Sequence, residues 1–213
     1  MNPSPCRVYS LLPPDVDATT ATGQPIWYAH PERTPVAPAD LSIQLARICR
    51  YHGAVDVSVL AHLALCAELA LALALPDDVV ALVAAHDLHE AYIGDVHPRI
   101  KAMCRGWNEL EAAWEQHVHR ALGLAWRPLI EVLTIDVLAL AVEARWKAHP
   151  AAVLIEQRMR AGWEARPHLE ARAPTGGDIM DLGMTVADRV LPLAAAAHWR
   201  IVSRAIPSLA GAR

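Results

Sequence analysis

The chain has 213 residues, 54% of them hydrophobic and only 5% aromatic, and its formal net charge is -4. Because non-specific binding to polymeric nucleic acid needs a basic surface that displaces counterions from phosphates, this charge excludes that class of function. Alanine and leucine form helices readily and strands poorly, so their long runs predict an all-α protein. The length suits one hydrophobic core, which predicts a single domain over residues 1–213.

The N-terminal part predicts an irregular arm followed by helices. Residues 1–38 contain many of the prolines, and residues 23–28 within them predict a short extended or hairpin piece. Apolar residues then recur at helical spacing over Asp40–Arg50, with Asp40 as the expected N-cap. A second helix is predicted over about 58–75, where Pro76 stops it.

A third helix is predicted over Val79–Ile93, with Asp77 or Asp78 as its N-cap and Gly94 at its end. Residues 164–178 contain prolines and glycines and predict a loop. The remaining helices are predicted over about 107–122, 129–148, 152–163 and 185–205, the last of them disturbed at Pro192.

The second predicted helix belongs to an apolar run, Val57–Leu75, that has about the length of a membrane span. His62 and Glu68 interrupt this run, and ionisable groups are costly inside lipid, so a buried helix of a soluble protein explains it better. The sequence shows no secretory signal and no CxxC pair, which predicts a cytoplasmic protein with free thiols. Its cysteines are Cys6, Cys49, Cys66 and Cys104.

The third predicted helix carries the residues most suited to chemistry. His86 and Glu90 are four residues apart, and Asp87 and Glu90 three, so their side chains are expected along one flank of the helix. A cation there would be ligated by His86 and Asp87, while Glu90 could orient or deprotonate a water. Asp95, just past the helix end, is a second acid or base candidate.

His62 and Asp136 are the other two expected ligands. A histidine on an apolar helix is more often a core residue bonded to a carbonyl, but the position of His62 one helix before a His-Asp pair favours a ligand. Asp136 lies in an apolar helix, where a carboxylate needs a metal, a cation or several donors; a salt bridge to Arg145 or Arg50 is the alternative. Two imidazoles and two carboxylates suit a divalent Mn, Fe, Co, Ni or Zn ion without selecting among them.

These motifs together resemble those of the HD-domain phosphohydrolase superfamily. The likeness covers about residues 22–146 and is greatest to the small phage and bacterial branch of 5'-deoxynucleotidases and dATP triphosphohydrolases. It rests on Arg50-Tyr51-His52-Gly53, on Ser58-Val59 with His62, on His86-Asp87 with Glu90 to Asp95, on Lys101, and on Asp136 with Glu143-Ala144-Arg145.

The resemblance implies an HD-type helical bundle with a metal-binding core over about 40–148, and a role for each matched residue. Homo-oligomers, a dimer or a closed ring, are common in this branch, and the mean hydropathy of +0.20 agrees with buried surface between subunits. By this resemblance His62, His86, Asp87 and Asp136 bind the metal, Glu90 activates or positions the attacking water, Arg50 contacts the phosphate, Asp95 supports the sugar or the leaving group, and Lys101 binds the phosphate chain.

The chain departs from the pattern of the family at some positions. Ala61 and Leu63 flank the first ligand histidine, where relatives usually carry Glu or Gln before it and Ser after it. The proline of the phosphate loop is displaced by one residue, which leaves Arg99 as an alternative to Lys101 at the phosphates. His117 and His119 are two residues apart on a predicted helix, point to different faces, and are given no role.

A nucleoside pocket is expected from rigid aromatic and apolar residues near the phosphate-binding arginine. An arm that simply packs on the core through Trp27 would have the same sequence. The residues expected to build this pocket are Tyr51, Trp27, Tyr28 and Ile26.

The expected function is hydrolysis of 2'-deoxynucleotides by a metal-dependent enzyme, with an additional Mg ion on the substrate phosphates as a further expectation. Lys101 and Arg50 offer more positive charge than a monophosphate needs, which favours a dATP-like triphosphate. The alternatives are a 5'-nucleotidase that acts on deoxynucleoside monophosphates, an enzyme that hydrolyses guanosine polyphosphate alarmones, and a non-catalytic module that senses a nucleotide.

Overall fold

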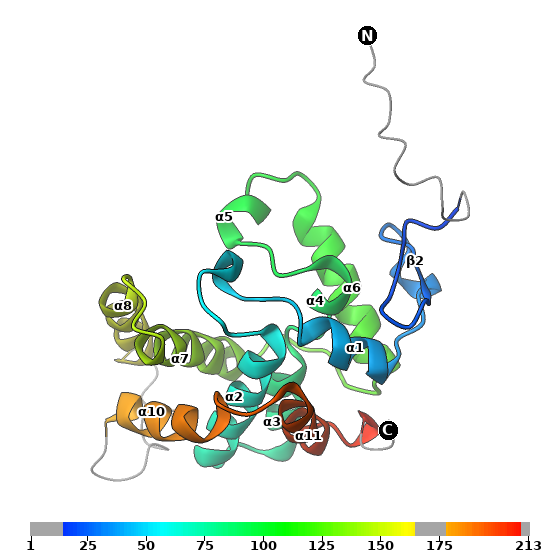
Figure 1. Cartoon of the computed structure of the whole chain (residues 1–213). Helices are drawn as coiled ribbons and strands as arrows, with labels where there is room; N and C mark the ends of the chain where they lie inside the picture. Colours follow the sequence, from blue (N-terminus) through cyan, green and yellow to red (C-terminus); the bar gives the residue numbers. More distant parts are fainter. Residues whose placement is uncertain (1–14, 165–177, 210–213) are drawn as a thin grey trace.

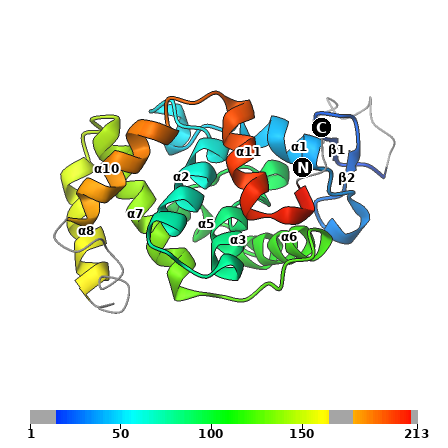
Figure 2. The ribbon, with the colours of Figure 1, turned by 90° about the horizontal axis from the view of Figure 1, so that it is seen from below.

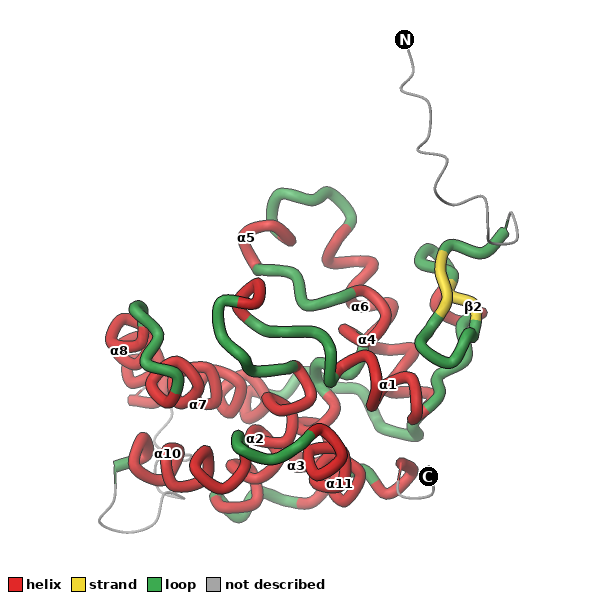
Figure 3. The backbone as a smooth tube through the Cα atoms, viewed as in Figure 1, coloured by secondary structure: helices red, strands yellow, loops and turns green. Residues whose placement is uncertain are grey.

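The structure is a computed structural model that describes residues 15–164 and 178–209. This part of the chain is helical apart from one small sheet, so the prediction of an all-α protein is confirmed (Figures 1 and 3). The helices are α1 (Pro38–Leu45), α2 (Val59–Ala72), α3 (Asp77–Ala85), α4 (Glu90–Ile93), α5 (Pro98–Lys101), α6 (Trp107–Ala121), α7 (Ile130–Trp146), α8 (Ala152–Glu164), α10 (Ile179–Val190) and α11 (Ala195–Ala205), with short 3-10 turns η2 (Pro31–Arg33), η3 (Tyr51–Gly53) and η4 (Pro207–Leu209).

The predicted hairpin piece is present in the N-terminal part of the described chain. Strands β1 (Ala18–Thr19) and β2 (Pro25–Ile26) pair antiparallel. Both views of the ribbon place this hairpin at the end of the molecule beside α6, away from α7 and α8 (Figures 1 and 2). The indole of Trp114 on α6 donates a hydrogen bond to the carbonyl of Tyr28 at 3.1 Å, which ties the segment after the hairpin to that helix.

Helix α2 forms the centre of the fold. It is apolar and buried almost all round, which is the pattern of a core helix rather than of a surface helix. Helices α3, α7, α10 and α11 pack against it (Figure 2). Ser58 is the N-cap of the helix, and its hydroxyl accepts a hydrogen bond from the backbone N–H of Ala61 at 3.1 Å. Among the described residues, none of the helices combines the length and the apolarity needed to cross a bilayer.

The third predicted helix, Val79–Ile93, is wrong as one continuous element. Helix α3 ends at Ala85 and α4 begins at Glu90, with a turn between them. The ring of His86 donates from Nδ1 to the carbonyl of Val83 at 2.7 Å, and His89 donates in the same way to the carbonyl of His86 at 3.1 Å. These side chains take up carbonyls that a regular helix would bond to backbone N–H groups, so the backbone tightens into 3-10-like turns.

Two predicted N-caps are also wrong. Helix α1 begins at Pro38, and Asp40 is a buried residue inside it whose carboxylate accepts two hydrogen bonds from Thr22 at 2.8 and 2.9 Å. The N-cap of α3 is Pro76. Asp77 and Asp78 lie in the first turn of α3, where carboxylates offset the positive end of the helix dipole.

The first predicted helix is too long, because α1 ends at Leu45 and not at Arg50, and the last predicted helix begins too late, because α10 begins at Ile179. The helix predicted over 185–205 is two helices, because the chain breaks at 191–194 around Pro192, which lacks a backbone N–H. Helices α6, α7 and α8 confirm the predictions over 107–122, 129–148 and 152–163 to within two residues. Most of the predicted loop over 164–178, and residues 1–14 of the predicted arm, lie outside the described residues.

Candidate metal centre

The four sequence-predicted ligands meet where α2, the end of α3 and the middle of α7 come together. His62 Nε2 lies 3.2 Å from Asp136 Oδ1, and His86 Nε2 lies 3.2 Å from Asp87 Oδ2. The two crossed distances, His62 to Asp87 and His86 to Asp136, are both 3.9 Å between the same atoms. Two atoms bound to one ion at about 2.0–2.2 Å cannot lie more than about 4.0–4.4 Å apart, and all four distances satisfy this limit.

A second grouping at the same place includes a thiol. Donor atoms of His62, Cys66 and His86 all lie within 4.8 Å of one another, so this cluster could hold a metal ion. Imidazole, carboxylate and thiolate together are compatible with several divalent metals, and the geometry alone selects none of them.

Both histidines are oriented by a hydrogen bond from the nitrogen that faces away from the centre. His62 Nδ1 donates to Glu143 Oε1 at 2.8 Å, and His86 Nδ1 donates to the carbonyl of Val83 at 2.7 Å. Nε2 of each ring therefore faces the other ligands, an arrangement typical of metal-binding histidines. His86 Nε2 is a buried atom without a hydrogen-bond partner, which fits a ligand position.

The electrostatics of the centre favour a cation. Burial alone would lower the pKa of His86, but the Asp87 carboxylate outweighs it and raises the pKa to about 9. Burial also opposes the ionised forms of Asp87 and Asp136, yet the neighbouring histidines hold the pKa of both carboxyls below the ordinary value. The negative potential that retains protons on these imidazoles would equally attract a divalent ion.

Arg50 and Glu143 form a second layer behind the four ligands. The guanidinium of Arg50 lies 3.5 Å from Asp87 and 3.8 Å from Asp136, and its Nε lies 3.4 Å from Glu143. Asp136 thus contacts both a ligand histidine and Arg50, so the salt bridge to Arg50 weighed from the sequence is present as well. The other alternative, Arg145, pairs with Glu156 at 3.8 Å.

The loop that carries Arg50 is held in a strained conformation. Tyr51 and His52 follow Arg50 with φ of 55° and 54°, the left-handed region that costs a non-glycine residue about 1–3 kcal/mol. The hydroxyl of Tyr51 donates to the carbonyl of Leu140 at 3.1 Å and lies 3.3 Å from Glu143. Tyr51 therefore anchors the loop to α7 through its hydroxyl, whereas the sequence predicted that its ring would form a wall of the nucleoside pocket.

Glu90 lies in the core beside the centre with an unusual proton affinity. Only 3% of the residue is exposed, and its Oε2 is buried without a hydrogen-bond partner. Burial, together with the charges of Asp87 and of the other predicted acid, Asp95, raises the pKa of Glu90 to about 10. A carboxylate in this environment is a strong base whenever nearby positive charge keeps it ionised.

Lys101 does not present a free ammonium group. It forms an ion pair with Glu111 on α6, and the same carboxylate lies 3.5 Å from His89 Nε2. Glu111 is thus a residue that the sequence analysis missed, and it neutralises the lysine expected at the phosphate chain.

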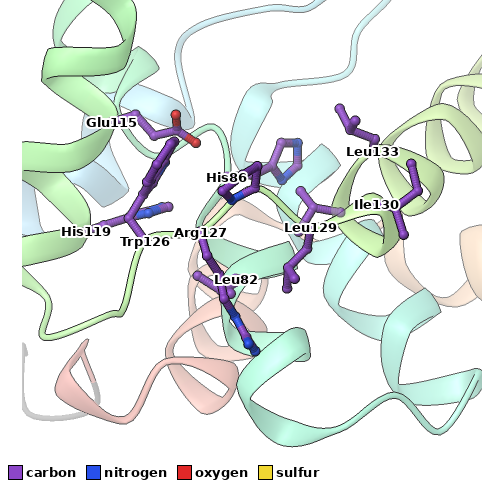
Figure 4. Close-up of a pocket in the computed structure, with 11 residues that line it drawn as sticks. Leu82, His86, Glu115, His119, Trp126, Arg127, Leu129, Ile130 and Leu133 are labelled. Carbon is purple, nitrogen blue, oxygen red and sulfur yellow. The ribbon is translucent and has the colours of Figure 1, made fainter.

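A pocket of about 390 Å³ adjoins the centre on the α6 side of His86 (Figure 4). Its walls are mostly apolar, from Leu82, Trp126 and the first turn of α7, with Glu115 and His119 from α6. His119, which was assigned no role from its position in the sequence, is buried and donates to the carbonyl of Ala85 at 3.3 Å. His86 belongs to both the pocket and the group of ligands.

The structure does not bring the other expected pocket residues to this place. Trp27 lies on the chain after β2, with the guanidinium of Arg33 over its ring at 4.3 Å and its indole donating to the carbonyl of Asp15. That segment lies beside α6 and away from α7, which carries Asp136 (Figures 1 and 2). Ile26 is buried in the same segment and Tyr28 follows Trp27 there, so the arm packs on α6 instead of forming a wall of the centre.

Two further residues of the centre, Glu143 and Cys66, were named from the sequence but given no role at the metal, although the sequence contains a signal for each. Glu143 follows Asp136 by two helical turns, and Cys66 follows His62 by one turn, so each lies on the same helix face as a predicted ligand. A buried glutamate in an apolar helix needs a partner just as Asp136 does. No family model matches this chain, and no curated protein matches it, so the HD-domain assignment remains a prediction from the motifs.

Proposed function

We propose that this protein is an HD-type phosphohydrolase that uses a divalent metal to hydrolyse 2'-deoxynucleotides, with a dATP-like triphosphate as the first candidate substrate. The observation that carries the proposal is the meeting of His62, His86, Asp87 and Asp136, in which each histidine Nε2 lies 3.2–3.9 Å from an oxygen of each aspartate. Partly buried carboxylates and oriented imidazoles with an arginine and an unpartnered glutamate beside them are the groups that phosphoryl transfer to water requires.

Each residue then has a defined task. A bound divalent ion would supply positive charge to the phosphate oxygens as negative charge builds on them. Arg50 directs its two terminal nitrogens at the carboxylates of the centre, so it can contact a phosphate held there. Glu90 would accept the proton of the attacking water at Oε2, the atom that lacks a partner.

A second candidate function is favoured by the pairing of the basic residues. Lys101 is neutralised by Glu111, and Arg50 lies against Glu143, Asp87 and Asp136. Less free positive charge is therefore available for three phosphates than the sequence alone predicted, which supports a 5'-nucleotidase that acts on deoxynucleoside monophosphates.

Incubation with a panel of nucleotides separates these functions. The protein, stripped of metal and reloaded with Mn, Co, Zn or Mg, is given each deoxynucleoside mono- and triphosphate and ATP, and the products are identified by chromatography. Triphosphate release together with the deoxynucleoside supports the first function, and phosphate release from monophosphates supports the second. Tight binding of an unchanged nucleotide would identify the non-catalytic sensor, and absence of any release or binding with every metal would overturn the proposal.

The pocket beside His86 is proposed as the site of the nucleobase. Its volume of about 390 Å³ lies within the range of ligand pockets, and the indole of Trp126 offers a face for stacking. Because His86 lines the pocket and also faces Asp87, a base in the pocket would hold its phosphate towards the centre.

Replacing Trp126 by alanine is expected to raise KM for nucleotides by about 5- to 150-fold, since stacking of a base on an aromatic side chain contributes about 1–3 kcal/mol. Hydrolysis of inorganic tripolyphosphate, which has no base, is expected to stay the same. Trp27→Ala is the matched control, because the indole of Trp27 lies on the distant hairpin segment. If the KM for nucleotides rises in the Trp27 variant and not in the Trp126 variant, the base binds at the N-terminal arm and not in the pocket beside His86.

A further inference from the structure

Cys66 is a buried thiol beside the ligand histidines. It lies one turn after His62 on α2 and is fully buried, whereas Cys49 and Cys104 are exposed. Its Sγ is 3.5 Å from Nε2 of His62 and 3.9 Å from Nδ1 of the same ring. Together with a donor of His86 it belongs to the group whose members all lie within 4.8 Å of one another.

The distance from Cys66 to His62 fits two ligands of one ion. Metal–nitrogen bonds of about 2.0–2.1 Å and metal–sulfur bonds of about 2.3 Å, at a tetrahedral angle, place the nitrogen and the sulfur about 3.5 Å apart. The observed separation of Sγ and Nε2 is 3.5 Å.

A second observation points to a ligand at this place. Nε2 of His86 is buried and has no hydrogen-bond partner, while its Nδ1 is already used on the carbonyl of Val83. The simpler role for Cys66 is a thiol that donates a weak hydrogen bond to His62. However, Nε2 of His62 also lies 3.2 Å from Asp136 Oδ1, and Nδ1 lies 2.8 Å from Glu143, so an imidazole nitrogen, a carboxylate oxygen and the thiol sulfur converge on one place.

We propose that Cys66 binds the same metal ion as His62 and His86, as a thiolate, and that this sulfur makes the site prefer Zn²⁺ or Co²⁺ over Mn²⁺ and Mg²⁺. On binding, the S–H bond breaks, the sulfur lone pair forms the bond to the ion, and the proton passes to the solvent buffer. The preference follows because a soft thiolate favours zinc, whereas hard oxygen ligands suit magnesium and manganese. This inference rests on the metal site of the proposed function but not on its nucleotide chemistry.

Titration of the metal-free protein with Co²⁺ tests the inference without an activity assay. Thiolate bound to Co²⁺ gives a strong near-ultraviolet charge-transfer band, which nitrogen and oxygen ligands do not give. The wild type is expected to show this band at one equivalent of Co²⁺. Cys66→Ser and Cys66→Ala are expected to lose it, while a variant with Cys6, Cys49 and Cys104 all replaced by serine keeps it. The ratio of Zn²⁺ affinity to Mn²⁺ affinity is expected to fall by about tenfold or more in Cys66→Ser.

The outcomes are distinguishable. Co²⁺ binding by the wild type without a sulfur band would overturn the inference and leave Cys66 as a hydrogen-bonding thiol, with the proposed phosphohydrolase intact. Absence of Co²⁺ binding in the wild type would overturn both. If neither Cys66 variant folds, the variant that retains Cys66 as its only cysteine tests the inference. A band in this variant supports Cys66 as the sulfur ligand, and loss of the band shows that another cysteine supplied it.

Discussion

Glu90→Gln is expected to slow nucleotide hydrolysis by about 10²–10⁴-fold, the usual contribution of a positioned acid or base. The amide has nearly the shape of the carboxyl group but cannot accept the proton of the attacking water at Oε2, which is buried without a partner. Metal content and nucleotide KM are expected to change little, because Glu90 is outside the set of ligands. Steady-state kinetics on the metal-loaded protein, with metal analysis of the same samples, measures both quantities.

Stability separates this catalytic role from a structural one. The raised pKa of Glu90, about 10, means that the folded, metal-free protein holds a proton which the unfolded chain releases at neutral pH. An acid with a raised pKa in the folded state destabilises the fold progressively as pH rises above the ordinary carboxyl pKa. The glutamine variant is therefore expected to be at least as stable as wild type at pH 7 to thermal unfolding. The control is Glu109→Gln, at an exposed position of α6, which should alter neither the rate of hydrolysis nor the stability. Full turnover in Glu90→Gln would contradict the assignment of Glu90 and leave Asp95 as the candidate for proton transfer.

The meeting of the four ligands was predictable because ionisable residues in apolar helices need polar partners. His62 and Asp136 are ionisable residues in apolar helices, and such groups are tolerable inside a core only with partners. His86 and Asp87 are adjacent, so a single turn after α3 delivers both to the same place. Each of these groups needs a partner in the core, and the four residues lie on three predicted helices where they can serve one another.

The surroundings of the ligands were not predictable, because they depend on contacts between distant segments. The break between α3 and α4 arises from histidine side chains that bond carbonyls, an option that periodicity does not register. The neutralisation of Lys101 requires knowing that Glu111, on another helix, lies beside it. The N-terminal arm packs on α6 through hydrogen bonds such as that from Trp114 to the carbonyl of Tyr28, so the expected stacking wall forms elsewhere.

Glu143→Ala is expected to reduce the free energy of unfolding by about 3–5 kcal/mol, the range for removing one partner of a buried ion pair. The side chain of Glu143 is fully buried, and that of Arg50 is only 12% exposed. One oxygen of Glu143 accepts from His62 at 2.8 Å, and the other lies 3.4 Å from Arg50 Nε and 3.3 Å from the Tyr51 hydroxyl. Loss of this carboxylate leaves a cavity and removes one of the negative charges that neutralise the buried guanidinium of Arg50. It also leaves the imidazole of His62 without the acceptor that orients it. Chemical denaturation of the metal-free protein measures the change.

The same substitution should act on the metal centre through His62. Residues that orient a ligand histidine typically contribute about 10–100-fold to metal affinity, so Glu143→Ala is expected to weaken Co²⁺ or Zn²⁺ binding by that factor. Glu143→Gln retains the volume and an oxygen that can accept from His62 Nδ1, so it should recover much of the metal affinity while the lost charge beside Arg50 still lowers stability. Glu156→Ala removes a glutamate that pairs with Arg160 at 2.8 Å near the surface, and is expected to cost no more than about 1 kcal/mol. A Glu143→Ala protein as stable and as tightly metal-bound as the Glu156 variant would show that Arg50 and His62 find other partners, and that the strained loop at Tyr51 is held without this carboxylate.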